Sequence, residues 1–132
     1  MKIIYFISFI AVLNFFSACN LFIQNQTPEI LTAEYKLKSY NDTERGFEVF
    51  LVIKNIRPEH KIKSIVLKKH RFDGINTHEM MKNQVFIDEF LILNSSMIQN
   101  FEPPMADKRN DGIIFDIEGE EHYIEIDFKL NN

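Results

Sequence analysis

The amino-acid sequence predicts an all-β fold: a small antiparallel β-sandwich, immunoglobulin-like in outline, with six or seven strands. Apolar and polar residues alternate along several short segments after residue 30, which is the pattern of half-buried strands. Turn-forming residues separate these segments at the short intervals that are typical of sandwiches. The chain has no tryptophan, so the likeness concerns architecture and not the Cys-Trp-Cys core of antibody domains.

Three strands are expected in the first half of the domain. Apolar residues alternate with polar ones in Ala33–Tyr40, and the turn at 41–46 is rich in Asn, Asp and Gly. Phe47–Lys54 is apolar on one face and half apolar on the other, which indicates a central strand. This strand should end before the proline at position 58, because proline has no N–H to donate. Ile62–Phe72 is expected to form one continuous strand with a buried middle.

The second half of the domain is expected to contain the one helical segment, further strands and a long loop. Asn76–Asn83 is predicted to form one or two helical turns capped by Thr77. The eleven residues 102–112 are predicted to be an exposed loop. The last two strands should pair as a hairpin. The strands of this half are expected at Gln84–Leu93, Met97–Phe101, Ile113–Ile117 and His122–Leu130.

The chain has 132 residues and a formal net charge of −4, which is an ordinary surface charge for a protein of this size. Nucleic-acid binding requires a strongly basic domain, so the composition argues against a nucleic-acid partner. Residues 30–132 have the length of one domain, which can bury a core without disulfides or a structural metal.

Opposite charges are concentrated in two segments. Residues 54–71 contain seven Lys and Arg and one Glu, whereas residues 111–127 contain seven Asp and Glu and neither Lys nor Arg. One interpretation makes the first segment a surface site for anionic headgroups or polyanionic glycans. The other, which we favour, pairs the two segments as neighbouring strands, where opposite charges attract across the ladder. The candidate basic patch consists of Lys61, Lys63, Lys68, Lys69 and Arg71.

The sequence offers no catalytic or metal-binding motif. The four histidines lack the spacing of zinc sites, and no serine lies in a nucleophile-elbow motif. We therefore predict that the protein is not an enzyme and that it uses no metal or cofactor. Sugar binding on exposed aromatic side chains is an alternative, with Tyr40, Phe101 and Tyr123 as candidate platforms.

The amino-terminal segment has the order of an export signal. A lysine at position 2 is followed by an apolar run to Phe16, then by small residues, then by Cys19, the only cysteine of the chain. The sequence Phe16-Ser17-Ala18-Cys19 resembles the lipobox of bacterial lipoproteins. This resemblance implies cleavage between Ala18 and Cys19 and lipidation of Cys19, which becomes the first mature residue.

Two other interpretations of this segment stay open: a plain cleaved signal, or a retained helix extending to Ile23, which would reach the roughly 20 residues needed to span a bilayer. The lipoprotein interpretation predicts a signal peptide at 1–18, a tether at 19–29 and the β-sandwich at 30–132. Acyl chains would then hold the domain at a membrane of the cell envelope, with a periplasm-facing position as the default.

The expected function is that of a non-catalytic interaction or assembly module that is anchored in a membrane and binds another envelope protein. The alternative is a ligand-binding domain for a glycan, a lipid or a peptide. A flat apolar patch or an open sheet edge would favour a protein partner, whereas an exposed aromatic cluster with convergent polar groups would favour a ligand.

Overall fold

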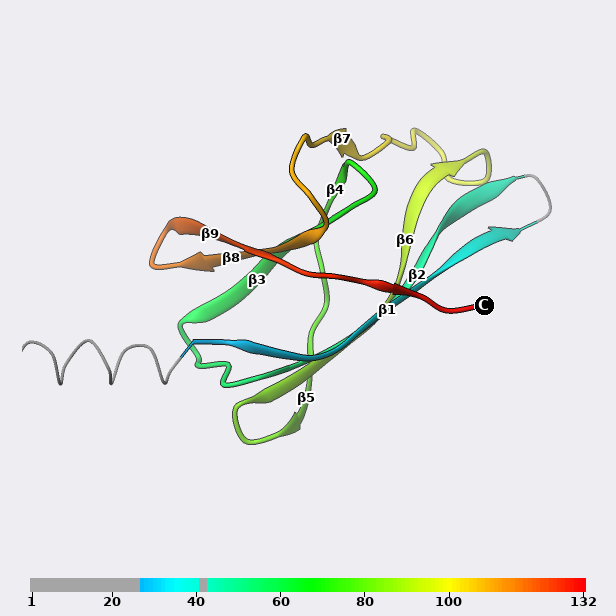
Figure 1. The fold of residues 1–132 in the computed structure, drawn as a ribbon. Coiled ribbons are helices and arrows are strands. Elements are labelled where there is room, and N and C mark those ends of the chain that lie inside the picture. The colour runs from blue at the N-terminus through cyan, green and yellow to red at the C-terminus, as the bar shows by residue number, and fades with distance from the viewer. Residues whose placement is uncertain (1–26, 41–42) are drawn as a thin grey trace, which may run out of the picture.

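The computed structural model describes residues 27–40 and 43–132, and these residues form two packed five-stranded sheets (Figure 1). Sheet A has the order β10-β1-β2-β6-β5, and sheet B has the order β7-β4-β3-β8-β9. Sheet A consists of β1 (Glu29–Tyr40), β2 (Glu44–Lys54), β5 (His78–Met81), β6 (Gln84–Ser95) and β10 (Lys129–Leu130). Sheet B consists of β3 (His60–Leu67), β4 (His70–Asp73), β7 (Met105–Ala106), β8 (Gly112–Ile117) and β9 (Glu120–Glu125).

The predicted sandwich is confirmed, and its strand order is that of an immunoglobulin-like domain. Strands β1, β2, β6 and β5 take the places of A, B, E and D, and strands β3, β8 and β9 take those of C, F and G. The two-residue strand β10 pairs in parallel with β1 at the edge of sheet A. With ten strands in the described residues, the structure has more strands than the six or seven expected, and the extra ones are short.

The core lies between the inner faces of the two sheets, and β2 is its central strand. Phe47, Val49, Leu51 and Ile53 all point inward from β2 and are at most 4% exposed. From sheet B, the core receives Ile65, Leu67, Ile113 and Phe115. Each fully buried side chain of this size stabilises the fold by about 1.5–3 kcal/mol. The alternation read from the sequence of β2 therefore describes the real inner face of this strand.

Gly46 allows β2 to approach β6 closely at a β-bulge. The register between these strands shifts between Arg45 and Gly46. A Cβ atom on Gly46 would lie 2.1 Å from the backbone oxygen of Leu91, a distance that real Cβ atoms do not show. A glycine is therefore required here for steric reasons, as is common where two backbones come close.

The predicted helix at 76–83 is wrong, because this segment contains β5. His78 pairs with Phe86 of β6, and the two rings stack with centroids 5.0 Å apart. Asn83 closes the turn between β5 and β6 with a φ of 60°, a left-handed conformation that asparagine tolerates. A helix of one or two turns is unstable alone, whereas a short strand completes the edge of an existing sheet.

The predicted single strand at 62–72 is also wrong, because a two-residue turn divides it into β3 and β4. Lys68 and Lys69 have φ values of 49° and 64°, as both central residues of a tight hairpin turn require. These positions usually hold Asn or Gly, so two lysines gave no signal for a turn. The hairpin places Arg71 and Asp73 beside β3.

Three boundaries near the carboxyl end also differ from expectation. The segment 97–101 contains no strand, and the predicted loop at 102–112 contains the short strand β7. The second arm of the last hairpin ends at Glu125, after which the chain crosses from sheet B to sheet A. Ile126 and Phe128 lie on this crossing and are buried, because the crossing closes the side of the core.

Two leucines that the sequence pattern places on the same inner face of sheet A should respond differently to truncation. Leu51 is fully buried, whereas Leu37 is 67% exposed on the part of β1 that follows its pairing with β10. We expect Leu51→Ala to lower the free energy of unfolding by about 2–5 kcal/mol. Leu37→Ala should change it by less than about 0.5 kcal/mol. Urea unfolding followed by circular dichroism measures both, and similar losses would contradict the described core.

Candidate interaction surface

The outer face of sheet A carries a strip of apolar side chains over its two central strands. The strip alternates with the inward-facing core residues of β2 and β6, so it points away from sheet B. Phe50 and Val52 belong to β2, and they lie opposite Asp88 and Phe86 of β6. We call this surface the aromatic strip; it consists of Phe50, Val52, Phe86, Phe90 and Ile92.

Phe50 is the most exposed residue in the middle of the strip. It is 38% exposed, whereas Val52 is 7% exposed and Phe86, Phe90 and Ile92 are half-buried. In the described residues, no loop covers this face of the sheet, because the connections to sheet B leave from the ends of the strands. The strip is therefore an uncovered apolar surface over the central strands of a sheet, and beside Phe50 it borders a shallow hollow of about 170 Å³ whose lining includes Glu34, Glu48 and Asp88.

Charged side chains border the aromatic strip on the β1 side and interrupt it on β6. Glu34 and Asp88 lie on either side of Phe50 in the register of the three strands. The ammonium group of Lys38 lies 2.7 Å from the carboxylate of Glu48 and holds the pKa of that carboxyl below its usual range. Apolar side chains with charged neighbours are a usual composition of protein–protein contact surfaces, although here Asp88 lies within the strip and not only at its rim.

The sequence pattern alone did not identify the aromatic strip. The half-apolar second face of Phe47–Lys54 predicts a central strand, and β2 does lie between β1 and β6. The structure shows that only one face is covered, and that Phe86 and Phe90 of β6 continue the apolar side chains of β2. The sequence offers one sign of this strip: Phe86 and Phe90 stand on the face of Gln84–Leu93 that also carries Asp88, so this otherwise polar face contains two aromatic residues.

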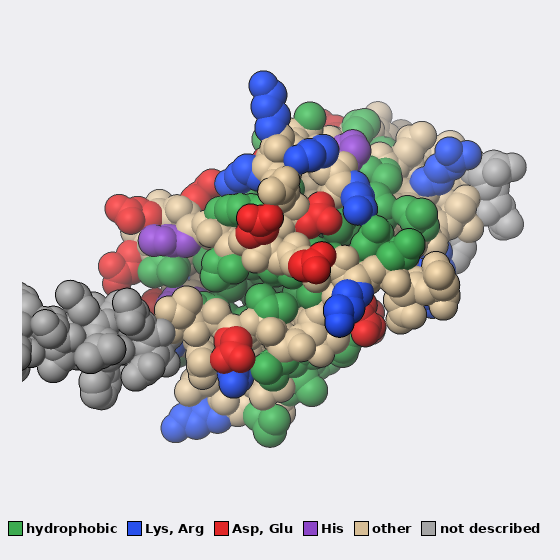
Figure 2. Space-filling model, viewed as in Figure 1, with side chains coloured by type: hydrophobic (Ala, Val, Ile, Leu, Met, Phe, Trp, Pro, Cys, Tyr) green, Lys and Arg blue, Asp and Glu red, His purple; other side chains and the backbone are tan. Residues whose placement is uncertain are grey.

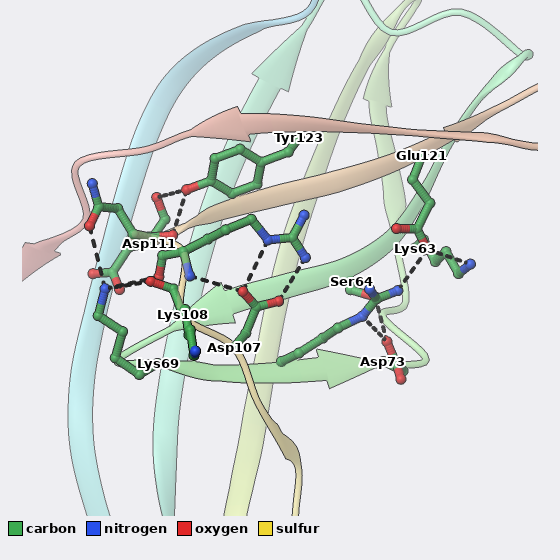
Figure 3. A network of polar contacts seen from close by, with 12 residues as sticks. Lys63, Ser64, Lys69, Asp73, Asp107, Lys108, Asp111, Glu121 and Tyr123 are labelled. Atoms are coloured by element: carbon green, nitrogen blue, oxygen red, sulfur yellow. Dashed lines mark hydrogen bonds and ion pairs between the residues drawn. The ribbon is translucent and has the colours of Figure 1, made fainter.

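The outer face of sheet B, in contrast, carries a network of ion pairs between the basic and acidic segments (Figure 3). Strands β3 and β8 pair antiparallel, which confirms the predicted pairing of these two segments. The carboxylate of Glu121 accepts hydrogen bonds from Lys63 at 2.8 Å and from Arg71 at 3.0 Å. These two cations hold the pKa of Glu121 at about 2.

Arg71 connects this ion pair to the buried part of the same face. Its Nε atom donates to the hydroxyl of Ser64 and to the carboxylate of Asp73, both at 3.1 Å. The Ser64 hydroxyl also donates to Asp73, and this bond lowers the pKa of the Asp73 carboxyl. Ser64 is fully buried although it points away from the main core. Arg71 therefore has a structural role, and its guanidinium is already engaged by three side chains.

The loop between β7 and β8 covers the rest of this face and fixes the turn at Lys68 and Lys69. The ammonium group of Lys69 donates to the carbonyls of Lys108 and Arg109 at 3.0 and 3.2 Å. The backbone N–H of Lys68 donates to the carboxylate of Asp111 at 2.8 Å. These contacts turn the loop, which the sequence predicted to be merely exposed, into a lid on sheet B.

Asp107 and Arg109 hold the lid together from within. The Asp107 carboxylate accepts bonds from the backbone N–H and the guanidinium of Arg109 at 2.7–3.0 Å, and these bonds lower the pKa of Asp107 to about 2. The guanidinium of Arg109 also lies 5.0 Å from the ring centre of Tyr123. Beneath the lid, Val66 and Ile114 are fully buried on the outer face of sheet B.

Most side chains of the candidate basic patch thus already have partners within the domain. Lys63 and Arg71 bind Glu121, Lys68 binds Asp111, and Lys69 binds the lid. Lys61 lies opposite Asp116 in the register of β3 and β8. These contacts favour the strand-pairing interpretation over an anion-binding site.

The histidines and the candidate aromatic platforms have local roles. His60 accepts the N–H of Arg57 at 3.3 Å and packs against Phe115. The Tyr123 hydroxyl donates to the backbone carbonyls of the lid, so its ring is not an open platform, and Phe101 is half-buried. Within residues 27–40 and 43–132, no group of three or more His, Asp or Glu side chains is placed to hold a metal ion.

Several sequence predictions lie outside the described residues. These are the signal segment with its cleavage site at Ala18, the lipidation site at Cys19, and the side chain of Tyr40. In the part of the chain that the structure describes, no helix has the length and hydropathy needed to cross a bilayer.

The ion pairs of Glu121 predict a specific dependence on pH. Its pKa in the folded state lies near 2, below the ordinary value of 4.5. The contribution of Glu121 to stability is therefore complete above about pH 4.5 and is lost as the pH falls toward 2. Titration of the side-chain carboxyl carbon by NMR measures this pKa directly. Arg71→Met and Lys63→Ala should each move the midpoint upward, and a midpoint near 4.5 in the unaltered protein would rule out the network.

Comparison of the chain with models of known protein families, with curated proteins and with solved structures finds no match.

Proposed function

We propose that this protein is a membrane-anchored lipoprotein of the bacterial cell envelope and that it acts as a non-catalytic interaction module. Lipid on Cys19 holds a single β-sandwich domain at the membrane, in a periplasm-facing position, through the tether at 19–29. The aromatic strip binds a second envelope protein. The order of charged, apolar and small residues before Cys19 supports the anchor, and the geometry of sheet A supports the binding surface.

The exposure of Phe50 is the observation that carries the binding role. An aromatic ring at the centre of a rigid sheet loses little conformational freedom on binding and buries a large apolar area. The neighbouring side chains of Phe86 and Phe90 extend this area, and the charged rim can exclude water around it. On the other sheet, the outward-facing side chains of Val66 and Ile114 are fully buried, and the lid contacts the same face through Lys68.

Ligand binding is the second candidate function, and one cavity supports it. An open cavity of about 470 Å³ lies where β1 begins, and its wall includes the apolar side chains of Phe115, Ile117 and Ile124. His60 and His122 also line it and could orient a polar group of a ligand. The cavity is open to solvent and has few convergent polar groups, whereas ligand sites bury most of their ligand. The aromatic strip is therefore the better supported site.

The anchor is tested by Cys19→Ser in the full chain, expressed in a bacterium that processes lipoproteins. We expect the variant to leave the membrane fraction for the soluble fraction, because the acyl chains are lost. Fractionation followed by immunoblotting measures this change, and mass spectrometry of the unaltered protein should show acyl groups on Cys19. Ser17→Thr serves as a control that keeps the cysteine. Full retention of Cys19→Ser in the membrane would favour the helical anchor.

The binding surface is tested by a photo-crosslinking amino acid that replaces Phe50 in cells. We expect a discrete protein adduct from position 50 and none from Met105, which is 65% exposed but lies on sheet B. With the partner identified by mass spectrometry, Phe50→Ala should weaken its binding about tenfold or more, as loss of an aromatic hot spot does. Adducts with a sugar polymer, or adducts from Met105 alone, would argue against this proposal.

A further inference from the structure

The end of the domain at which the tether enters is defined by the register of sheet A. Glu29, the first residue of β1, pairs with Lys54 at the end of β2, which pairs with Gln84 at the start of β6. The turn between β5 and β6 must therefore lie at the same end as Thr27 (Figure 1). The backbone N–H of Ile56 donates to the carbonyl of Asn83 at 2.9 Å and holds this turn against the chain that follows β2.

This end of the domain exposes two methionines side by side. Met80 and Met81 are 50% and 64% exposed, although their side chains are apolar, and neither belongs to the core. Figure 2 shows hydrophobic and basic side chains at the bottom of the view, where β5 turns into β6. Met80 and Met81 also line an open groove of about 700 Å³, with Arg57 and Pro58 on its other side.

The length of the tether keeps this end close to the bilayer. Seven residues lie between Cys19 and Thr27, so the chain makes eight steps from one to the other, and it advances by at most about 3.3–3.6 Å per step. Thr27 therefore cannot lie farther than about 28 Å from the lipid on Cys19, whatever path the tether takes. The exposed methionines Met80 and Met81 lie at the same end of the domain as Thr27, and this end is within reach of the membrane interface.

We infer that the turn between β5 and β6 rests on the membrane surface, with Met80 and Met81 inserted at the level of the headgroups. This inference depends on the proposed lipid anchor. Methionine side chains are flexible and apolar, so they can adapt to an irregular lipid interface. Insertion would bury apolar area that is exposed in the free domain.

The charges at this end predict that the contact is apolar and independent of anionic lipid. Lys54 pairs with Glu29 at 3.1 Å and Arg57 pairs with Glu59 at 3.5 Å, so these cations are already balanced. Glu79 stands next to the methionines and opposes the charge of Lys82. A basic membrane-binding surface would carry a large excess of Lys and Arg. With Lys61, which also lines the groove, these residues include four cations and three carboxylates, so the excess is a single charge.

The experiment places a polarity-sensitive fluorophore on the full lipidated chain, purified and reconstituted into phosphatidylcholine vesicles. Met81→Cys carries the label at the proposed contact. Met97→Cys is the matched control, because Met97 is 73% exposed and follows the far end of β6. The acylated Cys19 has no free thiol, so each variant carries one label.

We expect quenching by spin-labelled lipid to be about twofold or more stronger at position 81 than at position 97, because the former lies in the headgroup region. The difference should be the same when phosphatidylglycerol is added to the vesicles. A label at Lys82→Cys should be quenched more strongly than the label at position 97 when both methionines are present. When Met80 and Met81 are both replaced by Asp, this extra quenching at position 82 should disappear, while the protein stays on the vesicles.

The outcomes separate the two proposals. Equal quenching at positions 81 and 97 in protein that stays on the vesicles would overturn the docking and leave the anchor intact. Quenching that requires phosphatidylglycerol would overturn the apolar contact in favour of an electrostatic one. A chain that does not stay on the vesicles, and that takes up label at Cys19, would overturn the anchor and the docking together.

Discussion

The register between β2 and β6 is the constraint on which the rest of this structure depends. It places Leu51 opposite Ile87 in the core and Phe50 opposite Asp88 on the outer face. A slip of one residue would turn every core side chain of one strand to the surface. Gly46 fixes this register, because only a residue without a Cβ atom can occupy the close approach to Leu91. The buried core and the outward-facing aromatic strip are thus two results of the same pairing.

The outer faces of the two sheets differ in how much of their apolar surface other parts of the chain cover. On sheet B, the lid and the ion pairs around Glu121 cover Val66 and Ile114, and they use almost all of the candidate basic patch. On sheet A, the described chain provides no comparable cover for Phe50. A domain that seals one apolar face with its own loop and leaves the other open has the asymmetry expected of a binding module. This asymmetry is the reason for preferring sheet A as the functional face.

Much of this fold could be predicted from the sequence, because the long strands bury one face and alternate strictly. The inner face of β2, the buried middle of β3 and the pairing of the basic with the acidic segment all follow from that rule. The turn at Lys68 and Lys69 could not be predicted, because contacts with the lid stabilise it and not the local preference of lysine. β5 was missed for a similar reason: its residues are exposed, and only the edge of β6 makes them a strand. The aromatic strip could not be predicted from the sequence, because the pattern of residues does not tell which face of sheet A the second sheet covers.

The direction of β1 has a mechanical consequence. The proposed tether enters at the start of β1, and the proposed partner is held by the neighbouring strands β2 and β6 of the same sheet. Tension between membrane and partner would therefore run along β1, and its hydrogen bonds to β2, which lie across the strand axis, would share the load. Such a ladder breaks only when many bonds fail at once, whereas a strand pulled sideways loses them one at a time. Loaded in this way, β1 would act as a shear joint between the anchor and the bound partner.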